Sequence, residues 1–140
     1  MGPKLSSTTG TTPIKAAARS VLVVEDDVDV LHVIKDVIEA QGYRAIAVEN
    51  GEQALAALEE ERPALMLIDL FMPVMSGGEL LKVVKRNPQL SAIPRVIMTA
   101  ANDQMIGIRE DVPVLYKPVD FDALTRLLQK YCEPPRARPR

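Results

Sequence analysis

Four short apolar runs, each ending in a polar residue, constrain the fold of this chain more than any other feature. The residues that end the runs are Glu25 with Asp26, Asp69, Thr99 and Lys117. Strands that are buried on both faces of a parallel sheet read as continuous apolar runs of this kind. If the four strands lie parallel, their carboxyl ends share one edge of the sheet. Three carboxylates, a hydroxyl and an ammonium group would then meet in one crevice.

Strand-like and helix-like patterns alternate along the chain five times, which predicts an α/β fold. We predict strands over 21–25, 43–48, 64–68, 93–98 and 112–116, and helices over 27–41, 52–61, 79–86 and 121–131. Asp27 is a candidate cap for the first helix, Gly42 is a good stop for it, and Gly77 with Gly78 predicts a turn. The alternation favours a doubly wound, five-stranded parallel sheet with helices on both faces. Such sheets bind ligands at the carboxyl ends of their strands.

The two ends of the chain differ in composition from its middle. Residues 1–19 are rich in Ser, Thr, Gly, Pro and Ala, which predicts a flexible leader. Residues 20–132 form the predicted domain, and residues 133–140 are a tail rich in Pro and Arg. The sequence holds no apolar run of about 20 residues, so we expect no membrane contact and a cytoplasmic location.

The charge distribution and the cysteine content argue against two possibilities, a nucleic-acid partner and an internal disulfide. The net charge is −2, but the basic residues gather at the ends and leave 21–132 acidic, which does not favour nucleic acid. The single cysteine, Cys132, cannot form an internal disulfide. The tail after Tyr131 holds no pattern of a DNA-binding or catalytic module, so we expect any output to pass through a protein partner.

Four motifs in order make the chain resemble the receiver domain of two-component response regulators, over about residues 20–131. They are Val-Val-Glu25-Asp26-Asp27, Ile-Asp69-Leu-Phe-Met-Pro-Val-Met-Ser-Gly77, Met-Thr99-Ala100 and Lys117-Pro118. Each motif is weak alone, and the ordered set is strong. The chain is similar to the single-domain chemotaxis regulator of that family. The resemblance implies a flavodoxin-like sheet of strand order 2-1-3-4-5.

The resemblance also implies a role for each residue at the strand ends. Asp69 would accept a phosphoryl group from a sensor histidine kinase or a histidine phosphotransfer protein. Asp26, Asp69 and Glu25 would hold Mg²⁺, together with the backbone carbonyl of Phe71. Thr99 and Lys117 would bind the phosphoryl oxygens. The domain would be a signalling switch whose downstream target is unknown, and not an enzyme acting on an external metabolite.

The chemistry of these residues agrees with those roles. A carboxylate oxygen can attack phosphorus and form an acyl phosphate. The transferred group is strongly negative, so a divalent cation is needed to offset its charge, and Mg²⁺ prefers oxygen ligands. Without metal the carboxylates would raise one another's pKa, which the ammonium of Lys117 would partly relieve. An acidic pair such as Glu25-Asp26 taken alone is more often structural, for example as a helix cap.

Three features of the sequence, two single residues and one spacing, depart from the family pattern. Val114 stands where the family usually has an aromatic residue, and we expect Tyr116 to be a poor substitute because it points differently along the strand. Only 18 positions separate Thr99 from Lys117, which predicts a short or irregular fourth helix between them. Phe71 lies two residues after Asp69, and we expect its bulk to limit the attack of water and slow dephosphorylation.

Two other functions remain open at this point. One is a phosphorylation-independent docking or localisation hub built on the same fold, which Val114 and the short fourth-helix segment favour. The other is an aspartyl-phosphate hydrolase of the haloacid dehalogenase kind. Those enzymes carry Asp-x-Asp, whereas the run here is Asp69-Leu70-Phe71, so the second acid is missing.

Overall fold

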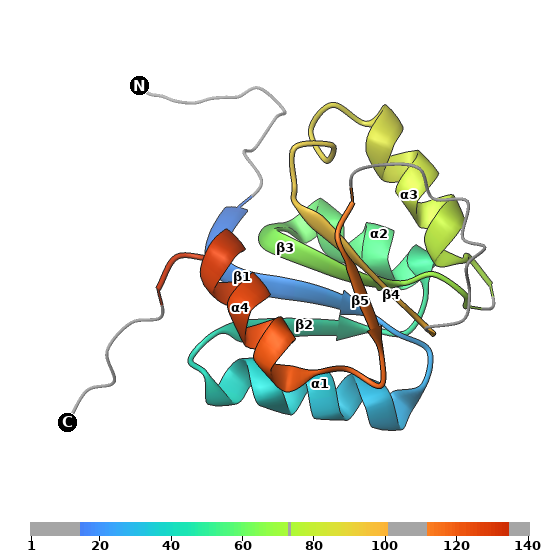
Figure 1. Cartoon of the computed structure of the whole chain (residues 1–140). Coiled ribbons are helices and arrows are strands. Elements are labelled where there is room, and N and C mark those ends of the chain that lie inside the picture. The colour runs from blue at the N-terminus through green and yellow to red at the C-terminus, as the bar shows by residue number, and fades with distance from the viewer. Residues whose placement is uncertain (1–14, 73, 101–111, 135–140) are drawn as a thin grey trace, which may run out of the picture.

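Five parallel strands form one sheet in the computed structural model, which describes residues 15–72, 74–100 and 112–134 (Figure 1). The strands are β1 (Lys15–Val24), β2 (Arg44–Val48), β3 (Glu61–Asp69), β4 (Arg95–Ala100) and β5 (Val114–Lys117). Their order across the sheet is β2-β1-β3-β4-β5, with every neighbouring pair parallel. The predicted doubly wound, flavodoxin-like sheet is therefore confirmed.

Four helices in the described part of the chain cover the sheet. They are α1 (Val28–Ala40), α2 (Gly51–Glu60), α3 (Gly77–Arg86) and α4 (Phe121–Tyr131). Helices α1 and α4 pack on one face, and α2 and α3 pack on the other (Figure 1). None of these helices is long and apolar enough to cross a bilayer.

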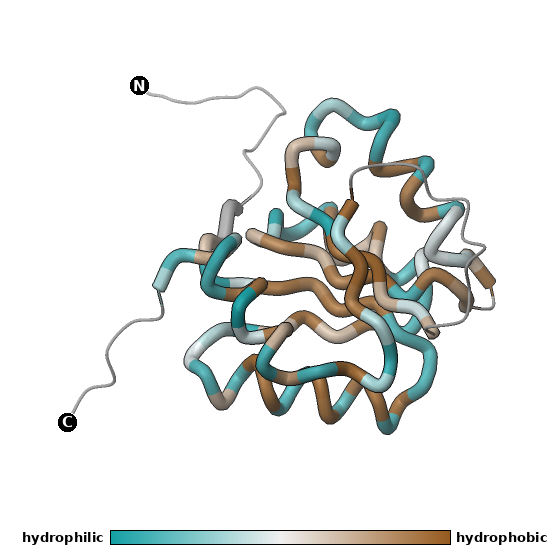
Figure 2. Tube along the Cα trace, viewed as in Figure 1, coloured by the Kyte–Doolittle hydropathy of each residue, from teal (hydrophilic) through white to brown (hydrophobic). Residues whose placement is uncertain are grey.

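The central strands divide their side chains between two cores because successive side chains point to opposite faces. On β1, Val21 and Val23 join the core under α1 and α4, whereas Leu22 and Val24 join the core under α2 and α3. On β3, Leu65 and Leu67 alternate with Met66 and Ile68 in the same way. All eight side chains are fully buried. This burial explains the unbroken apolar runs, and Figure 2 shows the central strands coloured as hydrophobic.

Side-chain caps begin the helices. The Asp27 carboxylate accepts hydrogen bonds from the backbone N–H groups of Asp29 and Val30, so the predicted cap is confirmed. Asn50, Ser76 and Asp120 cap the other three helices. Gly42 follows α1 with a φ of 92°, a left-handed conformation that a glycine adopts readily.

The boundaries of several elements differ from the sequence predictions, and strands β4 and β5 each begin two residues later than predicted. The sequence predicts a turn at Gly77 and Gly78, but they are the first residues of α3, because the Ser76 cap supports a helix that starts there. Strand β3 begins at Glu61, directly after α2, rather than at residue 64. The predicted fourth helix falls within 101–111 and lies outside the described residues.

Strand β1 begins at Lys15, six residues earlier than predicted, and so includes residues 15–19, which the sequence analysis assigned to the leader. Its first residues pair with the start of β3, and the register shifts between Ala17 and Val21. The C-terminal segment also meets this strand: the Glu133 N–H donates to the Ala18 carbonyl, and Arg19 Nε donates to the Pro134 carbonyl at 2.7 Å. Alanine-rich sequence has low strand propensity, so backbone pairing forms this extension without a sequence signal.

Candidate functional site

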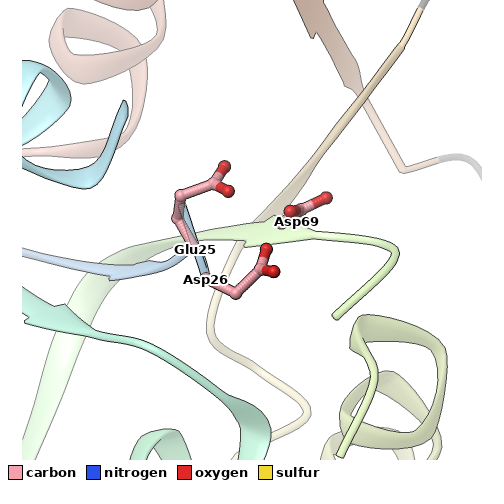
Figure 3. Close-up of side chains that lie close together, drawn as sticks. All are labelled: Glu25, Asp26 and Asp69. Atoms are coloured by element: carbon pink, nitrogen blue, oxygen red, sulfur yellow. The ribbon is translucent and has the colours of Figure 1, made fainter. Parts of the chain in front are cut away.

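The carboxyl ends of the strands bring the predicted acidic residues together. Glu25 and Asp26 follow β1, and Asp69 ends the neighbouring strand β3. One carboxylate oxygen from each of the three lies within 4.8 Å of the others. Figure 3 shows the three side chains converging from two strand ends. The predicted acidic cluster is therefore present as a compact group.

Glu25 is the most buried member of the cluster, with none of its surface exposed. Its Oε2 accepts a hydrogen bond from the Asp27 N–H at 3.1 Å, and its Oε1 forms an ion pair with Lys117 Nζ at 2.7 Å. Its backbone N–H donates to the Val48 carbonyl of β2. Both the backbone and the carboxylate of Glu25 are therefore fixed before any ligand arrives.

Asp69 is also buried, with 5% of its surface exposed. Its Oδ1 accepts a hydrogen bond from the Phe71 N–H at 3.3 Å, and its Oδ2 accepts one from Lys117 Nζ at 3.2 Å. Burial raises the pKa of Asp69 to about 7, and repulsion from Glu25 adds to the rise. The ammonium of Lys117 acts in the opposite direction without cancelling it. A further positive charge close to Asp69 would therefore stabilise the ionised form of its carboxylate.

Lys117, at the end of β5, bridges two of the three carboxylates. Burial alone would lower the pKa of its ammonium, but Glu25 and Asp69 outweigh this effect and the pKa is raised. Lys117 therefore stays charged near neutral pH. The sequence predicts that the Lys117 ammonium partly relieves the repulsion among the carboxylates, and its effect on Asp69 confirms this. The direct ion pair with Glu25 was not predicted, because β5 and β1 are not neighbours in the sheet.

The donor set fits a divalent cation that prefers oxygen ligands. Lys117 pairs with Glu25 and Asp69, so the three carboxylates, when fully ionised, carry two more negative charges than this ammonium offsets. Asp26 is exposed and makes the cluster accessible, whereas Glu25 and Asp69 are buried behind it. A small divalent cation among these oxygens would offset the excess charge. Carboxylates of this kind are typical ligands of Mg²⁺.

Thr99 lies where the sequence predicted it, near the end of β4. Its neighbour Met98 is in register with Asp69 on β3, and Thr99 itself is in register with Tyr116 on β5. Thr99 is 2% exposed, so its hydroxyl is a buried donor at the same edge of the sheet. The following residue, Ala100, is small and exposed.

The exposure of Val114, Tyr116 and Phe71 can be compared with what the sequence predicts for these side chains. Val114 and Tyr116 both lie exposed, on either side of the buried Leu115. The expectation that Tyr116 points differently from Val114 is wrong, because residues two apart on a strand share a face. Phe71 is 58% exposed, so its side chain stands at the surface two residues beyond Asp69.

Comparisons with known proteins agree with this geometry. The family model of the response regulator receiver domain matches residues 21–129. A Leptolyngbya boryana sequence described as an uncharacterized 14.6 kDa protein is 35% identical over 120 residues, 83% of this chain and 92% of that protein. The polar-differentiation response regulator DivK of Brucella anthropi is 40% identical over 82 residues, 59% of this chain and 67% of DivK.

Solved structures show the same architecture. The receiver domain of a sensor histidine kinase from Pseudomonas aeruginosa PAO1, with a magnesium ion coordinated in its active-site cleft, matches with a TM-score of 0.71 and 27% identity. The match covers 82% of this chain and 98% of that chain. A sensor protein from Polaromonas sp. JS666 matches with a TM-score of 0.74 over 82% of this chain and 96% of that chain, at 24% identity, and bears on the fold alone.

The fold, the acidic cluster and the family match define a signal-receiving domain. This chain belongs to the response regulator receiver domain family of two-component signalling. The match to the Leptolyngbya boryana protein spans most of both chains.

Proposed function

We propose that this protein is a phosphoacceptor switch of a phosphorelay, with Asp69 as the acceptor. The donor is a sensor histidine kinase or a histidine phosphotransfer protein, and the reaction depends on Mg²⁺. The phosphorylated form acts through contact with a protein target in the cytoplasm. The observation that supports this most is the position of Asp69, which is buried beside two other carboxylates and paired with the ammonium of Lys117.

In the proposed transfer, an oxygen of the ionised Asp69 carboxylate attacks the phosphorus of a phosphohistidine. A new O–P bond forms as the P–N bond breaks, and the donor nitrogen keeps the electron pair of that bond. Lys117 Nζ, 3.2 Å from Asp69 Oδ2, is placed to bind an oxygen of the transferred group. Thr99 supplies a hydroxyl donor from the neighbouring strand.

The carboxylates of Glu25, Asp26 and Asp69 and the backbone carbonyl of Phe71 would hold Mg²⁺. The ion supplies positive charge that offsets the negative charge of the transferred phosphoryl group. The residues of the chain fix the oxygens in place: Glu25 is held by Asp27 and Lys117, and Asp69 by Phe71 and Lys117.

Incubation with acetyl phosphate and Mg²⁺ tests the acceptor. We expect intact-mass spectrometry to show a gain of one phosphoryl group, which disappears in Asp69→Asn and when Mg²⁺ is removed with a chelator. Asp36→Asn is the matched control, because Asp36 is an exposed carboxylate on α1, away from the strand ends. A gain that persists in Asp69→Asn would contradict the assignment.

The docking-hub alternative predicts a different result in a binding assay. A hub would hold its partner equally well as wild type and as Asp69→Asn, with or without acetyl phosphate. A switch would change its affinity for the partner on phosphorylation, and the Asp69→Asn variant would not respond.

A further inference from the structure

Leu70, the residue after Asp69, forms backbone hydrogen bonds through both its N–H group and its carbonyl. The Leu70 N–H donates to the Met98 carbonyl of β4 at 3.1 Å, and the Leu70 carbonyl accepts from the Gly77 N–H at 3.1 Å. Leu70 lies between Asp69 and Phe71, whose N–H donates to the Asp69 carboxylate. The peptide groups around Asp69 are therefore held from the β4 side and from the Gly77 side.

Gly77 lies directly against the backbone of Asp69. A Cβ atom added at Gly77 would lie 2.1 Å from the Asp69 carbonyl oxygen and 2.8 Å from Leu70 Cα. Both are backbone atoms, so neither can swing aside as the end of a flexible side chain can. The φ angle of Gly77 is not positive, so the need for glycine here is one of space and not of backbone conformation.

The start of α3 holds Gly77 in this position. Ser76 and Glu79 form a capping box: the Glu79 N–H donates to Ser76 Oγ at 3.1 Å, and the Ser76 N–H donates to Glu79 Oε1 at 3.0 Å. One residue earlier, the Met75 carbonyl accepts from the Gly51 N–H at the start of α2. A side chain at Gly77 would therefore push on the Asp69 backbone, because the helix behind it is fixed.

We propose that Gly77 is a positioning residue for the acceptor site. Its missing side chain lets the backbone of Gly77 approach the backbone of Asp69 and Leu70, and this contact sets the direction of the Asp69 carboxylate and of the Phe71 peptide group. The inference rests on the proposed function, since it concerns the placement of the groups that would bind Mg²⁺. Gly77 itself touches neither metal nor phosphoryl group.

The test compares Gly77→Ala with Gly78→Ala. Both substitutions place alanine in the first turn of α3, but a Cβ at Gly78 has no heavy atom nearer than Ser76 Oγ at 3.8 Å. Calorimetric titration with Mg²⁺ alone should show binding weakened by about 10- to 100-fold in Gly77→Ala, as for changes to groups that orient metal ligands. Gly78→Ala should bind Mg²⁺ like wild type. Wild-type affinity in a folded Gly77→Ala variant would overturn the proposal.

A second measurement keeps the inference separate from the proposed function. The amide resonance of Phe71 in the metal-free protein reports its hydrogen bond to Asp69, and it should shift in Gly77→Ala but not in Gly78→Ala. If wild type binds no Mg²⁺, the proposed function fails, and the Phe71 resonance still tests the positioning role. An unshifted Phe71 resonance would overturn that role.

The double variant Gly77→Ala with Gly78→Ala guards against simple loss of folding. The second alanine favours the helix and adds stability away from the Asp69 backbone. If this variant folds and binds Mg²⁺ weakly, the positioning role is supported. If both Gly77 variants remain unfolded in the cold, Gly77 serves the whole fold rather than the acceptor site, and the proposal is overturned.

Discussion

At the residue scale, the burial of Asp69 opposes its ionisation. Its folded-state pKa is raised to about 7, mainly by burial and then by the charge of Glu25. In the unfolded chain the same carboxyl group titrates near its ordinary value of 3.8. Between these two pH values the folded protein keeps a proton that the unfolded chain has lost. The free energy of unfolding therefore falls as the pH rises through this window.

We predict that metal-free wild type is less stable than Asp69→Asn at pH 8 and that the difference disappears below about pH 4. Each unit of pKa displacement corresponds to about 1.4 kcal/mol, so the loss is of order 2–4 kcal/mol. Urea denaturation in the presence of a chelator, at several pH values, measures it. The amide introduced by the substitution does not titrate, so the difference between the two proteins isolates the Asp69 carboxyl group. A difference that stays constant with pH would contradict the prediction.

We expect the side chain of Phe71 to lengthen the lifetime of the phosphorylated form. Its side chain is 58% exposed at the rim of the site, two residues from the acceptor. We predict that Phe71→Asn speeds the loss of phosphate from Asp69 several-fold, because a smaller polar side chain admits and orients water. Release of inorganic phosphate after removal of acetyl phosphate gives the rate.

Val74→Asn is the control for the Phe71 substitution. Val74 is 70% exposed in the same loop, so this change introduces the same side chain further along the chain from Asp69. An equal lifetime in wild type and Phe71→Asn rejects the role of Phe71.

At the scale of elements, the capping box at Ser76 fixes the start of α3. We predict that Ser76→Ala lowers the free energy of unfolding by about 1 kcal/mol, since it leaves the Glu79 N–H without its acceptor. Ser91→Ala is the control, because the Ser91 hydroxyl is exposed and makes only a 3.4 Å contact with the Pro88 carbonyl. Thermal denaturation compares them, and equal losses would show that the cap contributes nothing specific.

Elements whose side chains alternate between two buried faces could be predicted from the sequence. The strands around Leu22 and Leu67 are recognisable as apolar runs because both faces of the sheet are covered. The start of β1 could not be predicted, because Ala16 and Ala17 join the sheet through backbone pairing with β3. The start of α3 was missed because a pair of glycines usually indicates a turn, and the cap at Ser76 outweighs that tendency.

At the scale of the whole molecule, the strand order decides which residues meet. Parallel strands in the order β2-β1-β3-β4-β5 place Glu25, Asp26 and Asp69 at the carboxyl ends of adjacent central strands, so their convergence follows from the predicted fold. The reach of Lys117 from the edge strand β5 to Glu25 depends on the side-chain packing of the folded protein. The raised pKa of Asp69 likewise depends on its burial in the folded protein, which cannot be predicted from the residues next to it in the sequence.

The contact between Glu133 and Ala18 has a practical consequence. It joins the last described residues to the first half of β1, whereas Asp69 lies at the carboxyl edge of the sheet. At about 3.3 Å per strand residue, roughly 20 Å of β1 separates Ala18 from that edge. A reporter protein fused close to the contact between Glu133 and Ala18 would therefore not cover the site around Asp69. The domain could therefore be inserted into a surface loop of another protein, with the carboxyl edge of its sheet and Asp69 facing away from that protein.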